Sequence, residues 1–187
     1  MPEGLLTYYP EVFDASASRE FLMALMTTTS WEQRSMNMFG KKIDTPRLTA
    51  WYGDPNKSYA FSGHRFNPLP WTPLLLEIKA VIESLANVTF NSVLLNYYRG
   101  SSDSVAWHSD NEEELGECPI IASVSFGHVR QFDIRPKGVT GEKYSIRLED
   151  GSVLLMKGVL QQKWEHRVPK ETSFMGPRIN LTFRTID

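Results

Sequence analysis

The second half of the chain is a succession of short segments with the character of β-strands. Glycine, aspartate and proline residues separate these segments, which we place at residues 91–98, 104–107, 119–126, 129–135, 143–148, 152–157, 163–168 and 178–185. Short strands that follow one another with such residues between them favour a β-sandwich or a jelly roll. No other feature of the chain restricts its fold as strongly.

Two helices are predicted ahead of the strands. Apolar residues recur at helical spacing over residues 21–26, and Ser16 or Ser18 is available as the N-cap of that helix. A second helix is predicted over residues 73–87, with Thr72 as its cap. We therefore expect a mainly β protein with N-terminal helices (α+β).

Before the strands, residues 5–13 are expected to form an early strand or a turn, and residues 36–42 a hairpin. Residues 44–68 are expected to be rich in loops, because turn signals and aromatic residues are dense there. We expect a single domain over residues 1–187, in which residues 1–90 form an N-terminal extension and residues 91–187 a jelly-roll core.

Length and charge set few limits on function. The chain has 187 residues, enough for one substantial core. Its net charge is −2, so no overall basic field points to nucleic acid. Lysine and arginine are nevertheless in local excess over residues 30–70 and 128–147, and such a basic rim can hold phosphates.

Cysteine content and hydropathy indicate the compartment. The single cysteine, Cys118, excludes an intrachain disulfide and a zinc cluster of cysteines, which fits a reducing compartment. The first residues lack the basic and apolar regions of a signal peptide, and no apolar stretch approaches the roughly 18 residues that span a bilayer. We expect an intracellular monomer with no membrane partner, cytoplasmic if bacterial and nuclear if eukaryotic.

The segment 178–184 alternates strictly between polar and apolar residues. In a strand the two sets point to opposite faces, with Ile179, Leu181 and Phe183 on one face. The polar face, which holds Arg178, Asn180, Thr182 and Arg184, has two interpretations. It is either exposed to solvent or turned inward to bind a carboxylate, for which the planar guanidinium is well suited.

Two histidines and one aspartate form a candidate metal site. His108 and Asp110 lie two apart at the end of a predicted strand, and His166 lies in a later strand. Two imidazoles and one carboxylate are the donors of the facial triad that holds Fe(II) with open positions. A lone His-x-Asp is more often a surface turn or a satisfied polar pair. His64 and His128 have no suitably spaced acidic partner, and we interpret both as structural or surface residues.

Taken in order, these pieces resemble the AlkB family of Fe(II)/2-oxoglutarate-dependent dioxygenases. The family's terminal signature Arg-x-Asn-x-Thr-x-Arg is matched at every fixed position by residues 178–184. The chain is also similar to the eukaryotic-type DNA and RNA repair members over Met38–Lys41, Pro46–Gly53, Tyr59–Gly63 and Ile121–Gly127. The resemblance covers most of residues 36–186 and implies a double-stranded β-helix, a jelly roll with the metal at its mouth.

The resemblance also implies the cofactors, Fe(II), 2-oxoglutarate and O2, and the residues that hold them. The iron ligands would be His108, Asp110 and His166. Arg178 would bind the distal carboxylate of 2-oxoglutarate, and Arg184 would lie near its keto-acid end. The remaining co-substrate contacts would come from Asn96, Tyr98, Asn180 and Thr182.

The substrate implied by the resemblance is alkylated DNA, with RNA as a second possibility. A base must leave the duplex before the metal can reach it. The hairpin tip Phe39, Gly40 and Lys41 resembles the family's intercalating wedge, although an ordinary hairpin would also fit the sequence. Phe61 would stack on the flipped base with Tyr59 nearby.

Base recognition is expected from residues beside these. Trp51 either lines the pocket, together with Tyr52, or packs in the core. Glu112 occupies the position of the acidic residue that recognises the base edge, and a carboxylate there favours cationic N1-methyladenine and N3-methylcytosine. A solvated acidic run is the other explanation of Glu112. Asn111 departs from the aspartate that is common in close relatives, which puts any contact from this position in doubt.

Three functions therefore follow from the sequence. The first is oxidative dealkylation of N-alkylated bases, which reverses alkylation damage directly. The second keeps the same chemistry on a protein or small-molecule substrate. The third is a nucleic-acid-binding module on a dead scaffold, against which the intact triad and both arginines of segment 178–184 argue.

Overall fold

The computed structural model describes residues 2–38, 41–55, 57, 59–61, 64–139 and 141–187. For residues 36–38, 41–42, 59–61 and 64–66 it describes the backbone alone. In the described part of the chain the strands are β1 (Leu6–Tyr9), β2 (Glu32–Met38), β3 (Lys41–Gly53), β4 (Tyr59–Phe61), β5 (His64–Phe66), β6 (Ser92–Tyr98), β7 (Val105–His108), β8 (Ile121–Gly127), β9 (Arg130–Pro136), β10 (Tyr144–Leu148), β11 (Ser152–Met156), β12 (Trp164–Val168) and β13 (Arg178–Arg184). The helices are α1 (Ala15–Thr28), α2 (Pro73–Ala86), the one-turn α3 (Leu160–Lys163) and the 3-10 turn η1 (Glu113–Leu115).

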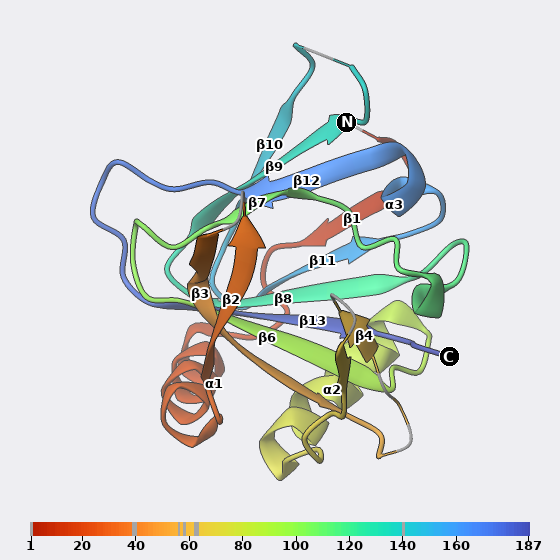
Figure 1. The fold of residues 1–187 in the computed structure, drawn as a ribbon. Helices are drawn as coiled ribbons and strands as arrows, with labels where there is room; N and C mark the ends of the chain where they lie inside the picture. Colours follow the sequence, from red (N-terminus) through yellow and green to blue (C-terminus); the bar gives the residue numbers. More distant parts are fainter. Residues whose placement is uncertain (1, 39–40, 56, 58, 62–63, 140) are drawn as a thin grey trace.

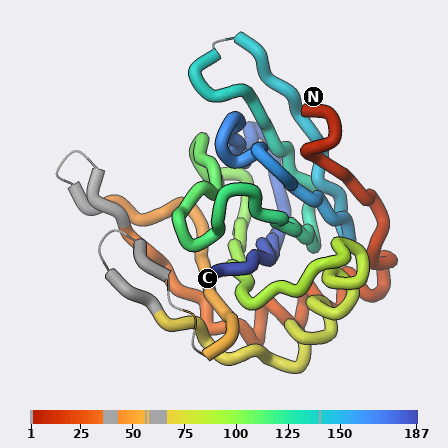
Figure 2. The backbone as a smooth tube through the Cα atoms, turned by 90° about the vertical axis from the view of Figure 1, so that its right-hand side faces the viewer, coloured from red at the N-terminus to blue at the C-terminus, as the bar shows by residue number. Residues whose placement is uncertain are grey.

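Two antiparallel sheets face each other (Figure 1). The larger has the order β1-β11-β8-β13-β6-β3-β2 and the smaller the order β10-β9-β12-β7. Helices α1 and α2 lie on the outer side of the large sheet, and in the view turned by 90° the β9–β10 hairpin stands at the opposite end of the molecule (Figure 2). The expected mainly β jelly roll is confirmed, and β1, β2 and β3 from the first ninety residues belong to the same large sheet as β6 and β13.

Strand β13 lies inside the large sheet, paired with β8 on one edge and β6 on the other. Ile179, Leu181 and Phe183 are completely buried in the core beneath the helices. The four polar residues of β13 line a cavity between the two sheets. The polar face is therefore turned inward, and its interpretation as a solvated surface was wrong.

The two long helices begin as their cap residues dictate. The Asp14 side chain accepts a hydrogen bond from the Ala17 amide at 2.9 Å and starts α1, so the prediction of a serine cap was wrong. Ser18 lies buried inside the helix instead. Thr72 caps α2 as predicted and accepts a hydrogen bond from the Leu75 amide at 3.2 Å. Both helices bury one apolar face against the large sheet, which fixes its outer side.

Residues 44–68 are more regular than the sequence indicates. Strand β3 runs from Lys41 to Gly53 and pairs with β6 from Leu48 onward, and β4 pairs with β5, so the loop-rich prediction for this segment was wrong. The register of β2 and β3 is irregular near Pro46, a position where proline is tolerated in a strand. The predicted hairpin is present in the backbone of β2 and β3, and its tip lies outside the described residues.

Gly151 joins the N-terminal segment to the large sheet and has no room for a side chain. Its φ is +73°, and a Cβ would overlap the carbonyl oxygen of Phe13. Left-handed backbone costs a non-glycine residue about 1–2 kcal/mol, and forced overpacking adds about 1–3 kcal/mol. We therefore expect Gly151→Ala to lower the free energy of unfolding by about 3 kcal/mol, as measured by urea denaturation.

Gly138 provides the matched control for this prediction. It has the same φ of +73°, and a Cβ there would have no atom of the described residues within 4 Å. Gly138→Ala should lower the free energy of unfolding only by the cost of the left-handed backbone, about 1–2 kcal/mol. Equal losses in the two variants would show that the close approach of Phe13 adds nothing to the cost of a side chain at Gly151.

Candidate active site

A cavity of about 850 Å³ lies between the two sheets and is lined by residues of both. The small sheet contributes His108 from β7 and His166 from β12, and the large sheet contributes side chains of β3, β6, β8, β11 and β13. The cavity lies in the mouth of the jelly roll, a usual place for a ligand site in such folds.

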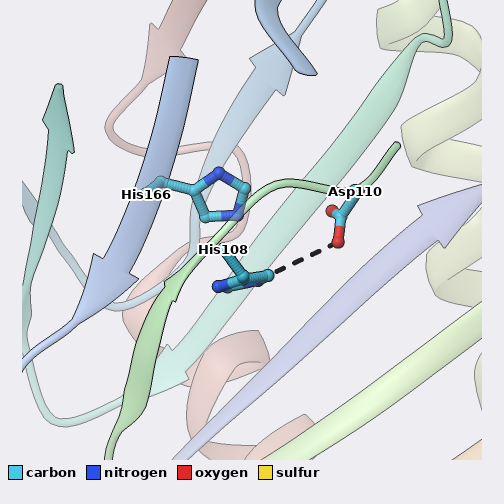
Figure 3. Close-up of side chains that lie close together, drawn as sticks. All are labelled: His108, Asp110 and His166. Atoms are coloured by element: carbon cyan, nitrogen blue, oxygen red, sulfur yellow. Dashed lines mark ion pairs between the residues drawn. The ribbon is translucent and has the colours of Figure 1, made fainter. Parts of the chain in front are cut away.

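His108, Asp110 and His166 come together at this cavity (Figure 3). One potential ligand atom of each residue lies within 4.8 Å of the others. His108 and His166 face each other as register partners on β7 and β12, with ring centroids 4.3 Å apart. His108 Nε2 is 3.9 Å from Asp110 Oδ1. Two imidazoles and one carboxylate in this arrangement suit a divalent iron with positions left open.

Burial and neighbouring charges set the protonation of two of these groups. Burial and the adjacent His108 lower the pKa of His166 to about 3. Burial raises the pKa of Asp110, but the positive charge of Arg184 and the two histidines outweigh it and bring the value to about 2. Near neutral pH His166 is therefore a neutral imidazole and Asp110 a carboxylate, the forms that bind a metal ion.

Neighbouring groups hold the triad in place. The Nδ1 atom of His108 lies 2.9 Å from the carbonyl oxygen of Ala106. A carbonyl only accepts, so this contact places the proton on Nδ1 and leaves the Nε2 lone pair for a metal. The Asp110 amide donates to Oε1 of the buried Gln161 at 3.0 Å, and Arg184 Nη2 lies 2.8 Å from Asp110 Oδ1.

Arg178 carries a buried positive charge that the described residues do not neutralise. Its Nη2 donates to Ser125 Oγ at 3.0 Å, whereas Nε and Nη1 make no hydrogen bond to any described residue. Burial lowers the pKa of Arg178 to about 10, with Tyr98 acting in the opposite direction, so the group stays cationic near neutral pH. A buried charge without a counter-charge is costly. The guanidinium therefore fits an incoming carboxylate, as 2-oxoglutarate would supply.

A chain of hydrogen bonds connects strands β3, β6, β13 and β8 along the cavity wall. Arg47 Nε donates to Asn96 Oδ1 at 2.7 Å, and Asn96 Nδ2 donates to Asn180 Oδ1 at 3.5 Å. Thr182 Oγ1 donates to the same oxygen at 3.0 Å, and Asn180 Nδ2 donates to Ser123 Oγ at 2.8 Å. Each amide is fixed in orientation because its oxygen and its nitrogen have different partners.

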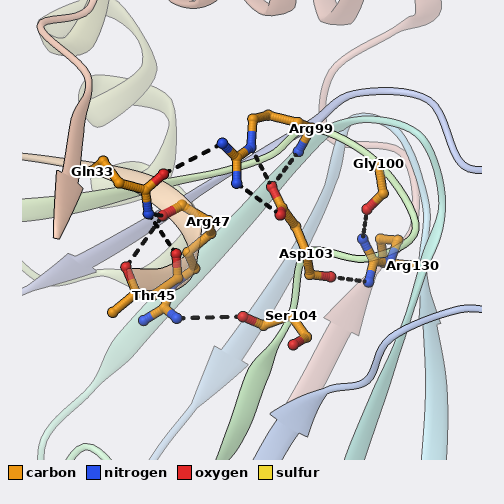
Figure 4. A network of polar contacts seen from close by, with 8 residues as sticks. All are labelled: Gln33, Thr45, Arg47, Arg99, Gly100, Asp103, Ser104 and Arg130. Carbon is orange, nitrogen blue, oxygen red and sulfur yellow. Dashed lines mark hydrogen bonds and ion pairs between the residues drawn. The ribbon is translucent and has the colours of Figure 1, made fainter. Parts of the chain in front are cut away.

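The segment that leads from β6 to the triad is held by arginines (Figure 4). Arg99 forms a two-point ion pair with Asp103, at 2.8 and 2.9 Å. The fully buried Arg130 donates to the carbonyls of Gly100 and Asp103, and Arg47 donates to that of Ser104 at 3.4 Å. These contacts fix residues 99–104, and β7 with His108 begins directly after them.

The cavity brings together most of the predicted site residues whose side chains the structure describes. Those that line it are Trp51, Asn96, Tyr98, His108, Asp110, Glu112, His166, Arg178, Asn180, Thr182 and Arg184. Tyr52 lies in the core, with its hydroxyl accepting from the Ser30 amide, so the core is the correct one of the two alternatives for this residue. Asn111 is exposed and lies outside the cavity lining.

The predictions for the base-recognition hairpins remain predictions. Phe39 and Gly40 lie outside the described residues. Lys41, Tyr59 and Phe61 are described in the backbone of β3 and β4 but not in their side chains.

Sequence reasoning missed three groups of the site. Arg47 lines the cavity, and its signal was the alternation that places it on the same face of β3 as Thr49 and Trp51. Gln161 lies in the one-turn helix α3, and nothing in its sequence context connects it with Asp110. The Ala106 carbonyl is a backbone group, whose role only the fold reveals.

Comparison with known proteins places the chain among iron oxygenases. The sequence profile of the 2OG-Fe(II) oxygenase superfamily matches residues 5–184. The mouse alpha-ketoglutarate-dependent dioxygenase alkB homolog 3 is 42% identical over 187 residues, which cover 95% of this chain and 65% of the relative. The human DNA oxidative demethylase ALKBH2 is 36% identical over 194 residues, which cover 98% of this chain and 70% of the relative.

The matches differ in how much of each related protein they cover. The chain spans about two thirds of the length of the alkB homolog 3 proteins that it matches, 65% for the mouse protein. The solved structure of OsALKBH1 superimposes with a TM-score of 0.68 at 16% identity and covers 99% of this chain and all of that one, which supports the fold. Among the described residues, no helix has the length and apolarity that crossing a membrane requires.

Proposed function

The chain belongs to the 2OG-Fe(II) oxygenase superfamily and, within it, to the AlkB family, and from this we propose that it removes alkyl groups from damaged nucleic-acid bases by oxidation. The family uses Fe(II), 2-oxoglutarate and O2. The observation that carries the proposal is the meeting of two features in one cavity: the triad of His108, Asp110 and His166, and the buried Arg178, which no described acid neutralises.

The residues of the cavity would bind the iron and 2-oxoglutarate. His108, Asp110 and His166 would hold the iron, and Arg178 would bind the distal carboxylate of 2-oxoglutarate. Arg184 would lie at the iron end, where it also pairs with Asp110. Tyr98 and the amide wall of Asn96, Asn180 and Thr182 would complete the co-substrate site. When bound, the iron supplies the oxidising chemistry: 2-oxoglutarate and O2 yield succinate and CO2, and the N-alkyl carbon gains an oxygen atom and leaves as an aldehyde.

The protein's own groups would prepare this reaction. Arg184 neutralises Asp110 and keeps it ionised at the metal end of the cavity. The Ala106 carbonyl and Gln161 fix His108 and the Asp110 backbone in the orientation that a metal needs. Arg178 and Arg184 lie at opposite ends of β13. Arg178 would pair with the distal carboxylate of the dianion, and Arg184 would lie near its keto-acid end.

The nucleic-acid substrate is proposed from the cavity and from the relatives. The human relative is named a DNA oxidative demethylase. Trp51 offers an aromatic surface in the cavity, with its Nε1 held by Ser92 Oγ at 3.3 Å. The hairpin tip Phe39, Gly40 and Lys41 would insert into the duplex. Phe61, with Tyr59 nearby, would stack on the extruded base. The substrates would be of the N1-methyladenine and N3-methylcytosine type.

Release of formaldehyde from methylated oligonucleotides tests this proposal. Duplex DNA, single-stranded DNA and RNA carrying N1-methyladenine or N3-methylcytosine would be incubated with the chain, Fe(II) and 2-oxoglutarate. We expect formaldehyde from at least one methylated strand and none from its unmethylated counterpart. Conversion of 2-oxoglutarate without formaldehyde from any of these strands would favour a protein or small-molecule substrate.

Glu112 is proposed to select cationic bases. It lines the cavity two residues after Asp110. A hydrogen bond that involves a charged group is worth about 1.5–3 kcal/mol, and 1.4 kcal/mol corresponds to a factor of ten. We therefore expect Glu112→Gln to lower kcat/KM for N1-methyladenine by about tenfold or more. Glu113→Gln, a neighbouring exposed position with the same charge change, should leave kcat/KM unaltered, and equal losses in both variants would rule out a specific role.

A further inference from the structure

The indole of Trp107 contacts two guanidinium groups on the outer face of the small sheet. Arg135 Cζ lies 4.1 Å and Arg167 Cζ 4.7 Å from the ring centroid. A cation within about 6 Å of an indole centroid is attracted by the ring's electron density. Trp107 belongs to β7, Arg167 to β12 and Arg135 to β9, so the contact joins three strands.

Both arginines are themselves held by acids on the opposite strand. Arg135 Nε on β9 lies 2.6 Å from Glu165 Oε1 on β12. Arg167 Nε on β12 lies 2.8 Å from Asp133 Oδ2 on β9, and Asp133 is completely buried. These two ion pairs hold both guanidinium groups in position beside the indole. We call these five residues the Trp107 clasp.

The proposed metal ligands lie on the other face of the same strand segments. Trp107 directly precedes His108, and Arg167 directly follows His166. Successive side chains of a strand point to opposite faces, so the clasp lies outside and the histidines inside. The clasp therefore holds β7 and β12 together next to the residues that carry the two imidazoles.

The backbone of β7 gives His108 little support of its own. The strand has four residues and lies at the edge of the small sheet. It pairs with β12 at His108–His166 and at Val105–Val168, and the register shifts between these two pairs. Such a bulge disrupts the hydrogen-bond ladder and re-aims side chains. Contacts between side chains must then fix the position of this strand.

The same irregularity sets the orientation of the His108 ring. The Ala106 carbonyl that contacts Nδ1 at 2.9 Å belongs to the residue next to Trp107, inside the irregular segment. A shift of the Trp107 backbone would move this carbonyl and the His108 Cα together. The orientation of the His108 ring is thus linked to the backbone beside Trp107.

We propose that Trp107, clasped by Arg135 and Arg167, is a positioning residue that sets the spacing and ring orientation of His108 relative to His166. The proposal rests on the proposed function, since it takes these histidines to be metal ligands. It adds a group on the opposite face of the sheet, outside the described lining of the cavity.

Binding of Mn²⁺ alone tests the clasp without any turnover. The free ion would be quantified by electron paramagnetic resonance as it is titrated with metal-free protein. Removing an outer partner of a metal ligand typically weakens binding about 10- to 100-fold, and we expect Trp107→Leu to raise the Kd by about tenfold. Trp107→Phe keeps an aromatic face and should recover most of the affinity. The visible absorption of bound Co²⁺ should change in Trp107→Leu and remain near wild type in Trp107→Phe.

Two controls separate positioning from general loss of stability. Arg147→Gln removes one charge from β10 in the same sheet, without a contact to the indole, and should leave the Kd unchanged. Gly138→Ala lowers stability in the connection between β9 and β10 without changing a clasp residue, and it should also bind Mn²⁺ as the wild type does. If Trp107→Leu does not fold, the double variant Arg135→Gln/Arg167→Gln takes its place with the same expected loss.

The outcomes distinguish the clasp from the function on which it rests. A Kd within twofold of wild type in the folded Trp107→Leu or double variant would overturn the clasp and leave the proposed function intact. A wild-type chain that binds no Mn²⁺ would overturn the assignment of the metal ligands together with the clasp.

Discussion

Asp110→Ala should lose more than about 100-fold in the turnover of 2-oxoglutarate. Loss of a group that only hydrogen-bonds to a metal ligand lowers metal affinity or activity by up to about 100-fold. Asp110 is proposed as a ligand itself, so its loss should cost more. The change would also leave Arg184 beside two histidines without the carboxylate that now lies 2.8 Å from its Nη2. A cation placed at a metal site opposes the binding of a divalent ion. Succinate formed per minute is the quantity to measure.

Glu113→Ala supplies the control for this loss. Glu113 is an exposed acid three residues away that does not line the cavity, and its removal should leave succinate formation unaltered. His166→Ala should behave like Asp110→Ala, because each removes one proposed ligand. Turnover at the full rate in either ligand variant would refute the assigned metal centre.

Arg178→Ala should raise the KM for 2-oxoglutarate by about 100-fold or more. Truncating one partner of a buried charge pair costs about 2–5 kcal/mol, and each 1.4 kcal/mol is a factor of ten. The side chain is almost fully buried, and the described residues give it no carboxylate partner. We therefore expect the loss to fall on co-substrate affinity rather than on the stability of the metal-free chain. Calorimetric titration with 2-oxoglutarate in the presence of Mn²⁺ measures this affinity directly.

Arg184→Ala is the informative comparison, because it lies at the other end of the same strand. Arg184 pairs with Asp110, so its loss should lower kcat and impair the handling of the base as well as the affinity for 2-oxoglutarate. The two variants should thus differ in how their losses divide between KM and kcat. Indistinguishable kinetics would show that the roles of the two arginines have been divided wrongly.

The sequence was most informative where a regular pattern coincides with a buried face. The alternation over residues 178–184 predicted β13, and the structure places its apolar residues in the core and its polar residues along the cavity. Alternation alone could not decide which face met solvent, since a polar face suits both water and a dianion. The histidines and the aspartate likewise became a site only through their order along the chain and the resemblance built on it.

The predictions that were wrong or missing depend on tertiary contacts. The part of β3 beyond the predicted hairpin was missed because its cavity-facing residues Arg47, Thr49 and Trp51 are mostly polar, which is also typical of a loop. Asp14 caps α1, so both serines that were candidate caps, Ser16 and Ser18, lie within the helix. Gln161 reaches Asp110 across 51 residues of chain, a contact that no local pattern encodes.

The measurement that tests the central claim most directly is the simultaneous count of succinate and formaldehyde on one methylated oligonucleotide. With Fe(II), 2-oxoglutarate and O2 present, we predict that the two products form in a one-to-one ratio on N3-methylcytosine. With the unmethylated strand we predict no formaldehyde. Succinate without formaldehyde on every methylated strand would contradict a base dealkylase, and the absence of both products would contradict the assigned chemistry itself.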